Sequence, residues 1–124
     1  MGRLVKEGRP YGWGRLHAAF QVLEGLAVGR TALGLPPELK KTTNTPRNNV
    51  ELLLPKAGLH LLLARERGGS HAEAAAVVFG DIARLVAPER MSRDNLNPQE
   101  ITEFRQGHAH QIGLYREKWG ALVP

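Results

Sequence analysis

Residues 96–115, LNPQEITEFRQGHAHQIGLY, hold a complete helix start followed by a helical apolar pattern. Asn97 is a good N-cap, Pro98 at the first helical position has no N–H to leave unsatisfied, and Glu100 stands where a capping-box acid reaches back to the cap. Apolar and aromatic residues then recur three and four positions apart, so one face of this helix is predicted to enter a core. That face consists of Ile101, Phe104, His108, Ile112, Tyr115 and Trp119.

Three further segments upstream have helical patterns, and none alternates as a strand would. A first helix is expected over residues 11–28 and a second over residues 45–67, the second opened by a cap followed by proline. Ser70 and Glu73 predict a capping box for a third helix, which Pro88 would end. The fold class is therefore predicted to be all-α, a single helical bundle of four to five helices.

The 124 residues suit one domain, 1–124, that is large enough for a core of its own. Within it, residues 1–10 form a basic N-terminal segment, and residues 31–44 form a connector described by its proline, threonine and asparagine content. The sequence contains no internal repeat and no low-complexity tract.

The second helix is apolar on more than one side. Its inward face is predicted to hold Val50, Leu53, Leu54, Ala57, Leu61 and Ala64. Another apolar surface, formed by Leu52, Leu59, Leu62 and Leu63, is turned away from that face. Two interpretations follow: either this is the central helix, buried nearly all round, or Leu52, Leu59 and Leu63 are a docking surface for another subunit. Pro55 within the segment can kink the helix.

Charge and composition narrow the class of protein. Seventeen Lys and Arg residues stand against twelve acids, a formal net charge of +5, and such a surplus favours polyanionic partners. The chain has no cysteine, which excludes disulfides, thiolate metal sites and a thiol nucleophile and fits a reducing compartment. With no long uncharged apolar run and no apolar signal core, we expect a cytoplasmic protein without a membrane partner.

Nine basic positions are candidate nucleic-acid contacts: Lys40, Lys41, Arg47, Arg65, Arg67, Arg90, Arg93, Arg105 and Arg116. The first three gather at the start of the second helix, where backbone N–H groups and the positive dipole end also favour phosphate. The alternatives are structural. Arg65 and Arg67 can complement the dipole at a helix C-terminus, and Arg105 and Arg116 can belong to a solvated face paired with acids.

No arrangement of residues predicts catalysis, a cofactor or a metal. His108 and His110 are two positions apart, so on a helix they point about 200° apart and cannot share one ion. His108 lies on the apolar stripe and is expected to be a hydrogen-bonded core histidine, and His60 is expected to pack. Tyr11 and Trp13 can stack on bases but are more often core or lid residues. We therefore predict no catalytic residues, no metal ligands and no enzymatic activity.

Two motifs resemble the carboxy-terminal part of the large subunit of type I-C CRISPR interference (Cascade) complexes. The first is the order Leu96, Glu100, Phe104, Gly107, His110 and Gln111, similar to a closing pattern Leu-Ser-x-Glu-Glu-x-x-x-Phe-x-x-Gly-Tyr-x-His-Gln. The second is the run TPRNNVELLLPKAGLHLLLAR, in which Thr45, Pro46, Leu53, Leu54, Ala57, His60, Leu61 and Arg65 fall in register. A fainter likeness is Gly14-Arg15-Leu16 in the first helix.

In type I-C systems this part is also made separately as a small subunit, which the chain resembles. The resemblance implies a non-catalytic helical bundle that supports R-loop formation and offers a basic path to the displaced non-target DNA strand. It implies as partners the large subunit, the backbone subunits, further copies of the chain, the crRNA and the target DNA. Two alternatives stay open, a free-standing basic helical DNA-binding regulator and a small helical enzyme using His108 or His60.

Overall fold

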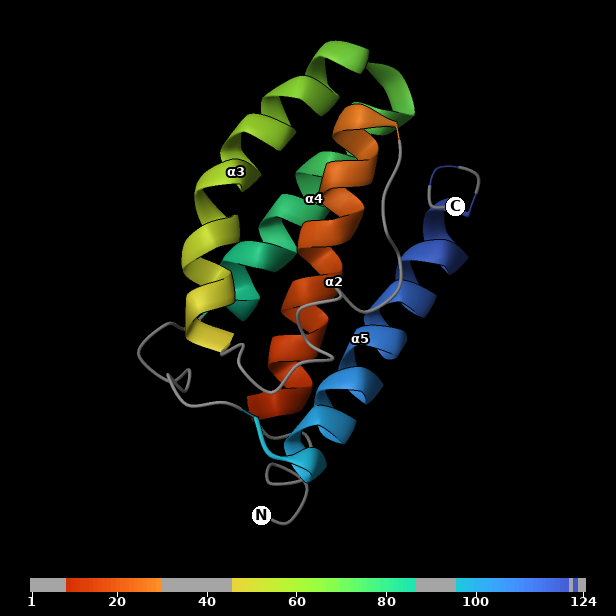
Figure 1. Cartoon of the computed structure of the whole chain (residues 1–124). Coiled ribbons are helices and arrows are strands. Elements are labelled where there is room, and N and C mark those ends of the chain that lie inside the picture. Colours follow the sequence, from red (N-terminus) through yellow and green to blue (C-terminus); the bar gives the residue numbers. More distant parts are fainter. Residues whose placement is uncertain (1–8, 30–45, 87–95, 121, 123–124) are drawn as a thin grey trace.

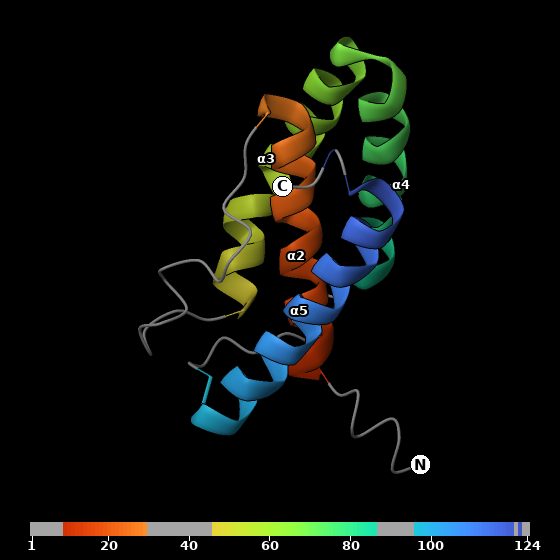
Figure 2. The same ribbon diagram turned by 90° about the vertical axis from the view of Figure 1, so that its right-hand side faces the viewer.

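The computed structural model describes residues 9–29, 46–86, 96–120 and 122, and these residues form four helices and no strand. The helices are α2 (Arg9–Val28), α3 (Pro46–Arg67), α4 (Gly69–Leu85) and α5 (Pro98–Trp119). Figures 1 and 2 show them as one bundle, with α3 and α5 on either side of α2. The predicted all-α helical bundle is confirmed.

The centre of the bundle is α2, which packs against each of the other three helices, while α3 and α4 also pack on each other. Most of α2 is buried, and its buried apolar side chains include Leu16, Phe20, Leu23 and Leu26. Ala18 and Ala19 are fully buried between them, and such small side chains let neighbouring helices approach on several sides. The interpretation of residues 45–67 as the central helix is therefore wrong, because α2 occupies that place.

Helix α3 lies at the edge of the bundle and runs through Pro55 to Arg67. Val50, Ala57 and Ala64 are buried, and Leu53 and Leu61 pack against the same core. Leu54, predicted on this inward face, is instead 39% exposed. It lies at the margin of the buried face, since it stands about 60° from Ala57 at 100° per residue.

The two predicted capping boxes have different outcomes. At α5, the backbone N–H of Glu100 donates to Asn97 Oδ1 at 2.8 Å, and Glu100 Oε1 accepts from the N–H of Asn97 at 3.0 Å, so this box is confirmed. The box predicted from Ser70 and Glu73 is wrong. Helix α4 begins at Gly69 behind an N-cap at Gly68 that makes no side-chain cap bond, which places Ser70 inside the first turn.

Candidate functional site

Helices α2 and α5 approach each other closely along a seam, and two glycines make this approach possible. A Cβ on Gly107 would lie 2.8 Å from the carbonyl carbon of Tyr11 and nearer still to its oxygen. A Cβ on Gly14 would lie 2.8 Å from the backbone N of His108 and nearer still to the carbonyl oxygen of Phe104. Each helix thus presses backbone against backbone where the other lacks a side chain.

Polar side chains bridge this seam next to the glycines. Arg15 Nε donates to Gln111 Oε1 at 2.8 Å, and the hydroxyl of Tyr11 is hydrogen-bonded to Nδ1 of His110. The rings of Tyr11 and His110 also lie 5.8 Å apart, centroid to centroid. Gln111 is buried and Arg15 is half-buried, so the Arg15–Gln111 bond is partly shielded from water.

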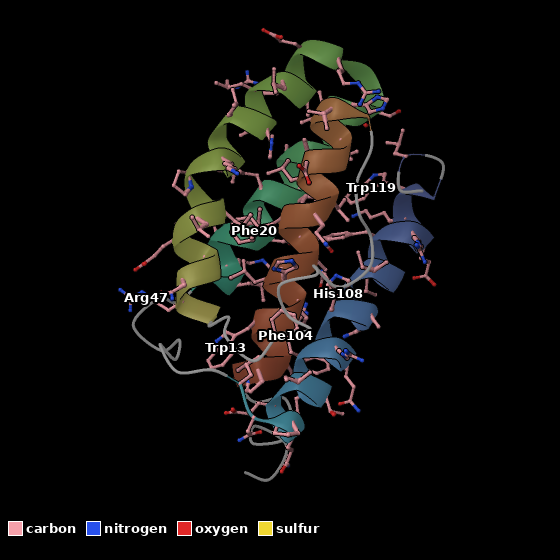
Figure 3. All side chains as sticks on the ribbon, in the orientation of Figure 1. Trp13, Phe20, Arg47, Phe104, His108 and Trp119 are labelled. Carbon is pink, nitrogen blue, oxygen red and sulfur yellow. The ribbon has the colours of Figure 1, made fainter. Side chains whose placement is uncertain are left out.

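Two buried histidines stand in the same seam. His108 Nε2 and Gln21 Oε1 are 2.5 Å apart, which confirms the predicted hydrogen-bonded core histidine (Figure 3). The ring of His17 lies 5.8 Å from that of Phe104 and 6.1 Å from that of His108. Burial lowers the pKa of His17 to about 3, with a smaller contribution from His108, and burial also lowers the pKa of His108. Both imidazoles are therefore neutral at neutral pH.

A further hydrogen bond joins α5 to α4. The hydroxyl of Tyr115 donates to Asp81 Oδ2 at 2.7 Å, and the other carboxylate oxygen of Asp81 forms an ion pair with Arg84. Burial, followed by the bond to Asp81, raises the pKa of Tyr115 above its ordinary value. Trp119 stacks on Tyr115 of the same helix with centroids 5.9 Å apart and packs against the core, so the last turns of α5 are tied to the bundle as well.

The predicted basic contacts that the structure describes do not form one cluster. Arg47 stands in the first turn of α3, where its Nε is 3.2 Å from Glu51 Oε2 (Figure 3). Arg65 is exposed in the last turn of the same helix, about 27 Å away at 1.5 Å per residue. Arg105 and Arg116 are exposed on α5, across α2 from α3 (Figure 1). Lys40, Lys41, Arg90 and Arg93 lie outside the described residues.

Arg67 has a structural role. Its Nη1 donates to the carbonyl oxygen of Leu26 at 2.9 Å, in the last turn of α2. That carbonyl is one of the last four in the helix, which have no partner within it. Arg67 stands in the last turn of α3, and its hydrogen bond goes to the C-terminal end of the neighbouring helix, a contact that the sequence did not predict.

Among the exposed arginines, the α5 pair shares a flank. Arg105 and Arg116 are eleven positions apart, about three turns, so they point the same way and stand about 17 Å apart along the axis. Thr102, Ala109 and Gly113 fall on this flank and are exposed, and they are small and uncharged. We call these five residues the α5 flank.

The predicted docking leucines differ in exposure. Leu52 is 68% exposed and Leu59 is 56% exposed, whereas Leu63 is half-buried. Leu62, which was placed on the same surface, is 57% exposed. The outer side of α3 is therefore apolar and open to solvent within the described part of the chain.

Trp13 is buried in the core, as expected of a core residue, and Tyr11 is half-buried at the seam. The sequence identifies no partner for His17 or His71, and the fold places the ring of His17 beside that of His108, 91 positions along the chain. Helical periodicity assigns a face within one helix and does not identify the residue opposite, so no local signal marked this pair.

Among residues 9–29, 46–86, 96–120 and 122, no group of three or more His, Cys, Asp or Glu residues could hold a metal ion. No helix in the described part of the chain is both long and apolar enough to span a bilayer. In comparisons with known proteins, no family model, no curated protein and no solved structure matches this chain.

Proposed function

We propose that this chain is the non-catalytic small subunit of a type I-C-like CRISPR interference complex. In this role it supports the R-loop and holds the displaced non-target strand through exposed cationic side chains. Guide pairing reads the sequence in such complexes, so the subunit needs a basic, base-tolerant surface and no recognition helix. A helical bundle with a surplus of positive charge is consistent with that task.

One observation carries most of the proposal. The fainter likeness on α2 and the closing motif on α5 meet at the α2–α5 seam, where Gly14 lies against the backbone of Phe104 and Arg15 donates to Gln111. A chance likeness of two short motifs has no reason to select residues that interlock in space. The meeting supports a common fold, while the family assignment itself stays a proposal.

The α5 flank is the described surface that best suits a single strand. Its two arginines are separated by small side chains, so a phosphate backbone could approach the helix closely and meet a cation near each end. Arg47 and Arg65, at opposite ends of α3, would contact nucleic acid only at other points of a longer path. We therefore expect Arg105 and Arg116 to contribute most among the described candidates.

The binding experiment uses the isolated chain and a poly(dT) oligonucleotide. Binding should be weak, and the logarithm of the association constant should fall linearly with the logarithm of the salt concentration. The slope should steepen by about 0.7 for each phosphate that is neutralised on a single strand. The variant Arg105→Ala/Arg116→Ala should weaken binding more than Ala76→Glu/Ala83→Glu, which changes the net charge equally on the exposed side of α4. Equal effects of the two variants would leave only net charge and would remove the α5 flank from the proposal.

A second variant tests Arg47 in the first turn of α3 together with two lysines that precede it in the sequence. Charge reversal at Lys40, Lys41 and Arg47 together should weaken binding to all single-stranded sequences about equally, because phosphate contacts carry no base information. Selective loss for one sequence, or tighter binding to duplex than to single strands, would favour the DNA-binding regulator.

Assembly is the other half of the proposal. Exposed Leu59 is expected to dock on a neighbouring protein subunit, so Leu59→Asp should leave helicity and melting close to wild type while incorporation into the guide-RNA complex drops. The matched control is Val77→Asp, at an apolar residue of α4 that is also exposed. If the wild-type chain never co-purifies with guide-binding backbone subunits, the family assignment is wrong.

A further inference from the structure

The outer side of α3 carries a narrow apolar line. Leu52, Pro55, Leu59 and Leu62 are all exposed and follow one another at intervals of three, four and three positions. At 100° per residue they fall within about 80° of the helix circumference, roughly opposite the buried Ala57 and Ala64. The line is about 15 Å long at 1.5 Å per residue.

This spacing is that of a coiled-coil seam. Alternating intervals of three and four place the residues at positions a, d, a and d of a heptad repeat, the narrow stripe that packs on one other helix. A stripe that faced the bundle core would be wider, as it is on the buried side of the same helix. The partner that fits is therefore a single helix with the same repeat.

Charges beside the line indicate which helix. With Leu52 and Leu59 at a, Glu51 occupies a g position and Lys56 the following e position, five residues later. In a parallel pair of identical helices, g of one chain stands beside the following e of the other. Glu51, which also accepts from Arg47 of its own helix, would therefore meet Lys56 of the second copy twice, once on each side. We infer that α3 pairs in parallel with α3 of a second copy of this chain, across a two-fold axis that runs along the leucine line.

The antiparallel arrangement is less favourable. Pairing Leu52 with Leu62 of the other copy places Lys56 opposite Gly58, about two residues from the other Lys56, a like-charge contact near the middle of the seam. In the parallel pair Glu66, at the next a position, would face Glu66 of the other copy, so the apolar contact ends before it and stays short. Four residues per chain cover less than the roughly 800 Å² per partner of a standard interface, and the dimer is accordingly weak and concentration-dependent.

This inference rests on the proposed function only in taking the outer side of α3 as a protein-docking surface, and it names the partner of that surface. The isolated chain should sediment as a monomer when dilute and shift toward a dimer as concentration rises, and Leu59→Asp should abolish the shift. Lys56→Glu should weaken the dimer, and the double variant Glu51→Lys/Lys56→Glu should restore it. A role of Lys56 in folding alone would produce no such restoration.

The orientation is tested by disulfide formation, because the chain has no cysteine of its own. In the parallel dimer each line residue faces its own counterpart, so Leu59→Cys and Leu52→Cys should each form disulfide-linked homodimers under mild oxidation. The control Val77→Cys, at an exposed position of α4, should not form such homodimers. Crosslinking only in a mixture of Leu52→Cys with Leu62→Cys would overturn the parallel arrangement.

A chain that stays monomeric at all concentrations and forms no line-specific disulfide would overturn the inference. That result would leave the proposed function untouched if Leu59→Asp still blocked entry into the guide-RNA complex. Conversely, a dimer of the inferred geometry in a chain that binds no single strand and joins no such complex would refute the proposed function and keep the dimer.

Discussion

Replacing Gly107 by alanine should destabilise the protein, although alanine is the better helix former. The added Cβ would stand 2.8 Å from the carbonyl carbon of Tyr11, where two carbons need about 3.5 Å. The obstacle is backbone of the central helix, which cannot rotate away as a side chain can. Helices α2 and α5 must therefore part locally by roughly 1 Å, in an interior that is packed like a crystal.

The expected cost follows from three contributions. Overpacking in a close-packed interior costs about 1–3 kcal/mol, and each seam hydrogen bond that loses its geometry, Arg15 to Gln111 or His108 to Gln21, costs about 1 kcal/mol. The exchange of glycine for alanine within a helix returns about 1 kcal/mol. We expect a net loss of about 2–4 kcal/mol in the free energy of unfolding.

Gly113 provides the matched control, since it lies six residues further along α5, is exposed and has nothing within 4 Å of an added Cβ. Gly113→Ala should stabilise the protein by about 1 kcal/mol through helix propensity alone. Both variants are compared with wild type by urea unfolding monitored by far-ultraviolet circular dichroism. A shift in the midpoint reports a change in stability if the m value, the dependence of the unfolding free energy on urea concentration, is unchanged. If Gly107→Ala is as stable as wild type, the helices do not approach as closely as described and the account of the seam fails with it.

Three other perturbations test separate parts of the fold. His17 is neutral in the folded protein, whereas in the unfolded chain its pKa is ordinary, near 6.5. Below that pH the unfolded state binds more protons, so the free energy of unfolding falls, by about 2 kcal/mol near pH 5. His17→Phe should flatten this part of a plot of urea midpoint against pH, and an unchanged slope would contradict the assignment. Arg67→Ala should lower the free energy of unfolding, measured by urea titration, by about 1 kcal/mol, because the bond to α2 is lost. Arg65→Ala should change it by less than about 0.5 kcal/mol, and equal effects of the two variants would contradict the structural role of Arg67. Asn97→Ala should lower the free energy of unfolding, measured by thermal melting, by about 1 kcal/mol, because α5 loses its N-cap. Ser70→Ala should leave it almost unchanged, and a larger effect at Ser70 than at Asn97 would mean that Ser70 caps α4.

How far the sequence predicts this fold depends on how local each signal is. The start of α5 was predictable because Asn97, Pro98 and Glu100 satisfy one another's requirements within a single turn. Ser70 and Glu73 have the same spacing and form no box, because the chain turns at Gly68 and Gly69 with φ of 74° and 55° and enters the helix before Ser70. A capping pattern is thus reliable only when the backbone ahead of it is extended, which a motif does not state.

The candidate site divides in the same way. Periodicity allowed two interpretations of the second helix, a central position or a docking surface. The exposure of Leu52 and Leu59 agrees with the docking surface. Periodicity could not choose, because it counts apolar faces and does not say how many neighbours a helix will have. Among the nine basic candidates, the structure distinguishes Arg67, bonded to α2, from Arg105 and Arg116, exposed together on α5.

The sequence alone determined the helical class, the stretches that become helices, the inward face of α5 and the surplus of positive charge, because each depends on residues close together in the chain or on composition. Only the tertiary structure decided that α2 is central, that Gly14 and Gly107 let α2 and α5 touch, and that His17 stands beside His108. Those facts join residues about 90 positions apart. Such pairs are selected by how side-chain volumes fit between helices, and that fit exists only once the helices have packed.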